Sequence, residues 1–170
     1  STQEAQREVA IEAAEQVLAV LAGEPARNTV NAPFLPPEVH AVLAPYIQVG
    51  LIVGKLLTHL AEGQFVGVTI RYEGEIAQHN TAMLKSAVLA GLLGPVTGNQ
   101  VNLINAPFLA QQRGLSLTEQ SNEAAAEYVS MITATLDTTG GPITVAGTSM
   151  RDEAHVVKVN DYWLDITPSS

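Results

Sequence analysis

The chain has 170 residues, 46% of them hydrophobic, which suffices for one domain with a buried core and an appended element. Its net charge of −9 and its 8 scattered Lys and Arg residues exclude a nucleic-acid or membrane-surface site, because such sites need clustered cations. It contains no cysteine, which excludes disulfides, thiolate metal sites and cysteine nucleophiles.

The first predicted element is a helix over Thr2–Ala22. Ser1 and Glu4 have the spacing of a capping box, and apolar residues then recur every fourth position until Gly23 and Pro25 end the pattern. This N-terminus lacks the basic segment and apolar run of a signal peptide, so a cytoplasmic location is expected.

Residues 25–36 are rich in proline and asparagine and predict an extended linker. The chain is therefore divided into a leading helix (1–24), a linker (25–36) and a main domain (37–168).

The most apolar segment, residues 39–60, predicts a buried helix. Polar residues such as Lys55 interrupt it, which favours a core helix over a membrane span. We expect a short turn at Pro37 and a main body over residues 45–62, with Pro45 starting or kinking the helix because proline cannot donate within one.

Residues 64–72 alternate between apolar and polar side chains and predict a strand with one buried face. Gly74 then indicates a turn or bulge. Asn80 or Thr81 is placed to cap a helix that runs to Leu93 and ends at the Gly94-Pro95 pair.

A third helix is expected after Asn105, with Pro107 in its first turn, and it ends at Gly114. Two hairpins follow, one joining 127–136 to 143–150 and one joining 154–159 to 162–166. The predicted fold class is α+β: a mainly antiparallel sheet with helices packed on one face, preceded by a long N-terminal helix and an extended linker.

Patterns for chemistry are sparse. The sequence contains neither of the glycine-rich phosphate-binding motifs, GxGxxG and Walker A. Its four histidines lie in four different segments, and none has the HExxH spacing of a metal site. The glycine pairs Gly50/Gly54 and Gly91/Gly94 are expected to allow close helix packing. Ser86 and Ser130 are expected to be ordinary helix and strand residues, and Glu73 and Glu75 solvated charges beside Gly74. No catalytic, cofactor-binding or metal-binding residue is predicted.

Six residues form a candidate anion or effector site. They comprise one cation on the polar face of a strand, two polar residues before a helix N-terminus, and three basic residues of the last hairpin. Together they would attract a phosphate or a carboxylate. The alternative is that these residues are isolated surface groups. The six are Arg71, His79, Asn80, Arg151, His155 and Lys158.

Several segments, in this order, resemble the long form of D-3-phosphoglycerate dehydrogenase. The first resembles the end of that family's catalytic region, the second its linker, and the rest its intervening domain, also called the allosteric substrate-binding domain. The segments are Ser1-Thr2-Gln3-Glu4-Ala5-Gln6, Val30-Asn31-Ala32-Pro33, Tyr72-Glu73-Gly74-Glu75-Ile76-Ala77, residues 84–95, residues 101–107, Gly147-Thr148 and the last hairpin.

The resemblance implies a non-catalytic regulatory and oligomerisation domain. Its parent enzyme would oxidise 3-phosphoglycerate to 3-phosphohydroxypyruvate with NAD in L-serine biosynthesis. The family's catalytic residues and NAD-binding glycines would precede residue 1, and a serine-sensing ACT domain would follow residue 168, so this fragment is expected to be inactive and to hold no cofactor.

The resemblance also implies contacts with other domains of the same chain and with further copies in a homo-oligomer. We therefore expect the helix Thr2–Ala22 to project from the domain or to swap onto a neighbouring copy. Relatives with an anion site place several arginines or lysines along the last hairpin, whereas this chain offers His155 and Lys158 there.

Two other classes are open. The main domain also resembles the related domain of iron–sulfur L-serine dehydratases, although the leading helix and the linker match the dehydrogenase. An unrelated small hydrolase would need Ser/His or paired Glu side chains gathered in one pocket.

Overall fold

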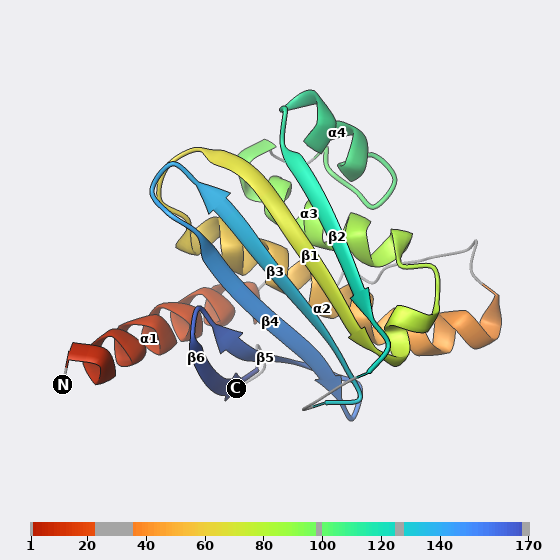
Figure 1. The fold of residues 1–170 in the computed structure, drawn as a ribbon, viewed down its shortest axis with the longest axis horizontal. Coiled ribbons are helices and arrows are strands. Elements are labelled where there is room, and N and C mark those ends of the chain that lie inside the picture. The colour runs from red at the N-terminus through yellow and green to blue at the C-terminus, as the bar shows by residue number, and fades with distance from the viewer. Residues whose placement is uncertain (1, 23–35, 98–99, 125–127, 168–170) are drawn as a thin grey trace.

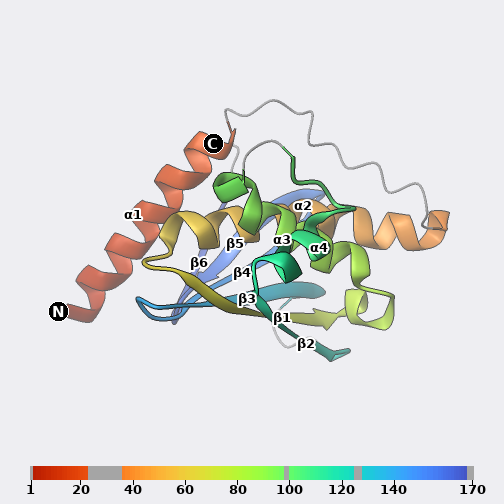
Figure 2. The same ribbon diagram turned by 90° about the horizontal axis from the view of Figure 1, so that it is seen from above.

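The computed structural model describes residues 2–22, 36–97, 100–124 and 128–167. Ser1 and the predicted linker, apart from Pro36, lie outside these ranges, so the division of the chain stays a prediction. The predicted α+β class is confirmed: helices pack on one face of a mostly antiparallel sheet (Figures 1 and 2).

The helical elements are α1 (Thr2–Ala22), α2 (Pro37–Leu60), the short 3₁₀ helix η2 (Glu75–Gln78), α3 (Ala82–Thr97) and α4 (Ala106–Gln112). The strands are β1 (Phe65–Gly74), β2 (Ser116–Asn122), β3 (Ser130–Thr138), β4 (Ile143–Met150), β5 (Glu153–Val159) and β6 (Tyr162–Ile166). They form one sheet in the order β2-β1-β3-β4-β5-β6, in which only the β1–β2 pair is parallel.

The early strand and both hairpins are confirmed, but the sequence prediction missed β2. Every residue of β2 is exposed, so its sequence lacks the alternation that marks a half-buried strand. In the fold, β2 adds a parallel edge strand beside β1, with Val68 opposite Leu117. The first hairpin also differs at its start, because β3 begins at Ser130 and residue 127 lies outside the described part of the chain.

The buried core lies between the sheet and the α2–α3 pair. The helix α2 is long and apolar enough to cross a membrane, judged by length and composition alone. Half of its most apolar segment is buried inside the domain, however, and the helix packs on α3 and the sheet. This agrees with the prediction of a core helix. A Cβ on Gly54 or Gly91 would collide with the backbone of the facing helix, and one on Gly50 would touch Ala87 at 3.0 Å. Gly94 has nothing within 4 Å of its Cβ position, so the packing role predicted for that residue is wrong.

Two predicted helix boundaries are wrong. The helix α2 is continuous from Pro37, with Pro45 inside it rather than at its start. The helix α3 continues past Leu93 to Thr97, with Pro95 in its last turn, where the Thr97 hydroxyl donates to the Leu93 carbonyl oxygen at 2.6 Å. A proline near a helix end removes only one hydrogen bond, which tertiary packing can offset.

The helix α1 lies beside α2, β5 and β6. Ala14 and Leu18 are buried in the core cluster, so the prediction that this helix projects from the domain is wrong for its second half. Val9 and Val20 remain 65% exposed, which leaves much of its surface uncovered. Exchange of α1 between copies stays a prediction.

Candidate functional site

The sheet has one face covered by helices and one open face. Figure 2 shows α2, α3 and α4 together on one side, and Figure 1 looks onto the other side, which no helix of the described part of the chain covers. Along β1, Val68, Ile70 and Tyr72 are buried beneath the helices, whereas Thr69 and Arg71 alternate with them and face outward.

The strand register brings two of the predicted cations into one row on this open face. Residues directly opposite each other on neighbouring strands point to the same side of a sheet. With strands about 4.8 Å apart, three strand spacings separate the two cations by about 14 Å. This cation row consists of Arg71, Thr133, Ala146, Lys158 and Trp163.

Lys158 lies over an aromatic ring. Its Nζ is 5.0 Å from the ring centroid of Trp163 on β6, a cation–π geometry that orders the lysine without neutralising it. Trp163 is 46% exposed, and it is the chain's only tryptophan. Neighbouring Ala146 is fully buried although no helix of the described ranges covers this face, so the side chains around it cover this part of the row.

His155 lies on the same strand as Lys158 but between two carboxylates. Its Nδ1 is 2.6 Å from Asp165 Oδ1, and its Nε2 is 3.8 Å from Glu153 Oε1. Both carboxylates compete with any external anion for the imidazole. His155 therefore contributes less attraction than its position suggests.

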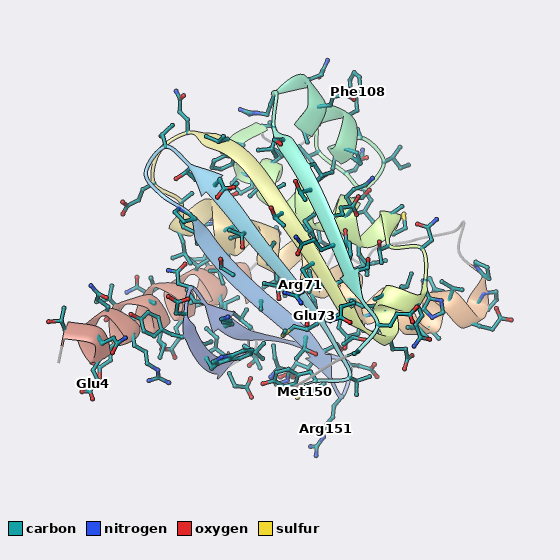
Figure 3. The ribbon with its side chains drawn as sticks, viewed as in Figure 1. Glu4, Arg71, Glu73, Phe108, Met150 and Arg151 are labelled. Atoms are coloured by element: carbon teal, nitrogen blue, oxygen red, sulfur yellow. The ribbon has the colours of Figure 1, made fainter. Side chains whose placement is uncertain are left out.

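Arg71 also has an acidic neighbour. Its Nε lies 3.7 Å from Glu73 Oε1, and the arginine side chain is 48% exposed (Figure 3). The Glu73 side chain is only 15% exposed, so solvent screens this pair less than a fully exposed one, and Glu73 competes with a ligand for the guanidinium.

The other three predicted residues lie at the end of the sheet rather than on the row. Asn80 uses its side-chain oxygen to accept the Ala82 amide at the start of α3, at 2.9 Å, and His79 precedes it. Arg151 occupies the β4–β5 turn with a positive φ of 54°, and Figure 3 shows it extending beyond the hairpin tip. The six predicted residues therefore do not converge on one point.

Sequence reasoning missed the row partners Thr133, Ala146 and Trp163. The available signal was the alternation of each strand, which assigns these residues to the polar face. Alternation cannot supply the register that aligns them, because register depends on the turns and on the bulge between Val156 and Lys158.

A second polar cluster ties the edge strand to the domain. The buried Tyr72 hydroxyl donates to Glu119 Oε2 of β2 at 2.9 Å, and Lys85 Nζ of α3 lies 4.0 Å from Glu119 Oε1. Burial raises the pKa of Tyr72 above its ordinary value, and the hydrogen bond and charge of Glu119 raise it further. A tyrosine held neutral in this way is a stable hydrogen-bond donor rather than a base.

The described residues do not fit a dinucleotide. The strand-to-helix junction from β1 to α3 holds Glu73 and Glu75, which repel a pyrophosphate, and Asn80 already occupies an amide at the helix start. Ser130 Oγ accepts the Ile76 amide at 3.1 Å and Ser86 is buried within α3, so both serines are structural, as predicted. Within the described ranges, no group of three His, Asp or Glu side chains is placed to hold a metal ion.

Comparison with known proteins decides the family. Residues 42–160 match the family model described as the D-3-phosphoglycerate dehydrogenase intervening domain. The chain belongs to this family. The predicted resemblance is confirmed, and this match favours the dehydrogenase domain over the dehydratase domain and the small hydrolase.

Whole relatives of the intervening domain are much longer than this chain. D-3-phosphoglycerate dehydrogenase of Methanocaldococcus jannaschii is 32% identical over 168 residues, which cover 99% of this chain and 32% of the relative. The Bacillus subtilis enzyme is 30% identical over 170 residues, which cover 99% of this chain and 32% of that enzyme. The chloroplastic enzyme 2 of Arabidopsis thaliana is 40% identical over 124 residues, with 71% and 20% covered. The chain spans about a third of the length of the first two.

Proposed function

We propose that this chain is the non-catalytic regulatory and assembly domain of a D-3-phosphoglycerate dehydrogenase. The complete enzyme oxidises 3-phosphoglycerate to 3-phosphohydroxypyruvate with NAD in L-serine biosynthesis. The match to the intervening domain supports this assignment, as does the coverage of 32% of relatives named for that activity. The remaining length of such an enzyme supplies the catalytic domains and an ACT domain as partners.

Hydride transfer belongs to the rest of the enzyme. The acidic β1–α3 junction supports this division of labour, because Glu73 and Glu75 disfavour the pyrophosphate of NAD there. The purified chain, mixed with NAD and 3-phosphoglycerate, is expected to form no NADH detectable by absorbance. Turnover by the chain alone would overturn the assignment.

The cation row carries the regulatory part of the proposal. Arg71 and Lys158 lie at opposite ends of the row, with the half-buried Thr133 and the fully buried Ala146 between them. 3-Phosphoglycerate carries a phosphate at one end and a carboxylate at the other. The strands separate the two cations by about 14 Å, more than the length of this three-carbon acid, so it reaches both only when the long Arg71 and Lys158 side chains turn inward along the row.

Binding at the row is expected to be weak. Glu73 stands beside Arg71, and Asp165 and Glu153 stand beside His155, so the net local charge is not positive. Few ionic contacts in exposed surroundings correspond to dissociation constants of roughly 1 mM.

Isothermal calorimetry of 3-phosphoglycerate, phosphohydroxypyruvate and serine against the chain tests this site. The two phosphorylated acids are expected to bind in the range of roughly 1 mM and serine not to bind. The double variant His155→Ala/Lys158→Ala is expected to lose the heat signal. Micromolar affinity, or binding unchanged in the double variant, would contradict the site.

A further inference from the structure

The helix α1 and one end of the sheet leave an open-sided cavity between them. Its volume is about 670 Å³, a size typical of sites for small ligands. The first half of α1 forms one wall, and the end of α2 with the β3–β4 and β5–β6 turns forms the other; Figures 1 and 2 both show α1 beside β6. We call this space the α1 cavity; its lining includes Val9, Ala10, Glu62, Ile143 and Asp161.

The cavity is open because α1 packs closely on the domain only over its second half. Ala14 and Leu18 are buried in the core, whereas Val9, in the first half, is 65% exposed. Ala10 and Ala13 line the cavity, and their short side chains leave it unfilled. Apolar side chains around an unfilled space favour a ligand with an apolar body.

Hydrogen bonds hold both walls of the cavity in place. On the helix side, Arg7 Nη2 donates to the Trp163 carbonyl oxygen at 3.3 Å, which ties α1 to β6. On the turn side, Asn160 Oδ1 accepts the Thr144 amide at 3.1 Å, and the Asn160 amide donates to the Thr144 carbonyl oxygen at 2.7 Å. A cavity whose walls are already held loses less free energy to ordering when a ligand binds.

The charges of the lining select the sign of the ligand. Glu62, just after α2, and Asp161, in the β5–β6 turn, both line the cavity, and within the described part of the chain no Lys, Arg or His lines it. The cation row, with Arg71 and Lys158, has the opposite character. Two carboxylates beside apolar side chains attract a cation and repel acidic metabolites such as 3-phosphoglycerate.

We propose that the α1 cavity binds a small organic cation, an alkylammonium or arylammonium with an apolar body and a positively charged end. The apolar body lies against Val9, Ala10 and Ile143, and the ammonium group lies near Glu62 and Asp161. A ligand in this position contacts α1 and both turns at once, so it holds the helix against the domain. The inference goes beyond the proposed regulatory function and does not depend on the cation row.

NMR spectroscopy of the isotope-labelled chain tests the proposal with three probes that share one alkyl group. Hexylammonium is expected to shift the backbone amides of Val9, Ile143 and Asp161 and to saturate at roughly 1–10 mM. Uncharged hexan-1-ol is expected to bind more weakly, and hexanoate to leave these amides unchanged. Hexanoate binding as tight as that of hexylammonium, shifts confined to other elements, or no shifts at all would overturn the proposal.

A pair of charge variants tests the two carboxylates. Glu62→Gln/Asp161→Asn is expected to weaken hexylammonium binding by about fivefold and to leave hexan-1-ol binding unchanged. The matched control Glu38→Gln/Asp152→Asn makes the same change of net charge at exposed positions outside the cavity, and it is expected to bind as the wild type does. Equal losses in the two double variants would refute the assignment of the cation to this cavity.

A pair of size variants tests the apolar wall. Ala10→Phe fills the cavity and is expected to weaken hexylammonium and hexan-1-ol alike by about tenfold. Ala41→Phe, at an exposed position of α2 outside the cavity, is the control and is expected to bind both probes as the wild type does. Unchanged binding in Ala10→Phe would contradict the site. Both variants are expected to bind 3-phosphoglycerate as the wild type does, so failure of this inference and failure of the regulatory proposal are separate results.

Discussion

The two faces of the sheet differ in what determines their residues. On the covered face of β1, Val68, Ile70 and Tyr72 are at most 2% exposed and pack beneath α2 and α3. On the open face of the same strand, Arg71 and its neighbour Glu73 contact each other and solvent. Adjacent residues of one strand are therefore under different constraints, since core packing restricts one set and the other set meets solvent.

The largest expected effect comes from the covered face. Ile70→Ala leaves a cavity in a fully buried position and is expected to lower the free energy of unfolding by about 2–5 kcal/mol. The adjacent control Thr69→Ala, on the open face, is expected to change it by less than about 0.5 kcal/mol. Urea denaturation measures both. Similar losses at the two positions would show that the faces are not distinct.

A smaller loss is expected where α2 and α3 approach most closely. A Cβ on Gly54 would overlap backbone atoms of Val88 and Leu92, so Gly54→Ala must push the helices apart, at a cost of about 1–3 kcal/mol. Gly94→Ala is the matched control, because nothing lies within 4 Å of its Cβ position. A Gly54→Ala variant as stable as Gly94→Ala would contradict the packing described for this helix pair.

The Tyr72–Glu119 hydrogen bond joins the covered face to the edge strand. Tyr72→Phe is expected to lower stability at neutral pH by about 1 kcal/mol, because Glu119 loses a donor.

The same tyrosine predicts a pH dependence. Its folded pKa is raised, so the folded chain keeps the proton while the unfolded chain loses it above a pH of about 10. Stability from this group is present below that pH and falls above it, by up to about 1.4 kcal/mol per pH unit. Denaturation of the wild type and of Tyr72→Phe at neutral and alkaline pH measures the slope, which should be shallower in the variant. Equal slopes would contradict the raised pKa.

The smallest stability effect is expected on the cation row. Lys158→Ala removes a partly exposed cation–π contact and is expected to cost about 0.5 kcal/mol. A loss of several kcal/mol would show that Lys158 holds the fold together rather than serving a ligand. Thermal unfolding by circular dichroism distinguishes the two.

The sequence predicts the strands that have one buried and one exposed face, and it misses β2, which is exposed on both faces. Strand β1 and both hairpins show alternation, but β2 is exposed on both sides and is held by pairing with β1 and by Glu119. The sequence predicts that Pro45 starts or kinks α2 and that the Gly94-Pro95 pair ends α3, yet both helices, packed on each other, continue through their prolines. A local sequence pattern does not show whether helix packing outweighs the hydrogen bond that a proline removes.

The candidate site was predicted as residue types and not as an arrangement. Arg71 and Lys158 lie far apart in the sequence, and only the register through β3 and β4 puts them in one row. Asn80 instead accepts a backbone amide at the start of α3, and His79 ends the 3₁₀ helix η2. Such a site depends on the register between distant strands and on which neighbouring groups already bind each side chain. Neither can be predicted from the spacing of residues in the sequence.

The fluorescence of Trp163 tests most directly whether the open face binds ligands. This single tryptophan lies 5.0 Å from Lys158 Nζ, so an anion that draws the lysine away from the ring should change its emission. Titration with 3-phosphoglycerate is expected to give a saturable change at roughly 1 mM, abolished in Lys158→Ala. The change should persist in Arg151→Asn, which removes a cation at the hairpin tip, where φ is 54°. An unchanged wild-type emission, or an identical response from Lys158→Ala, would contradict the account.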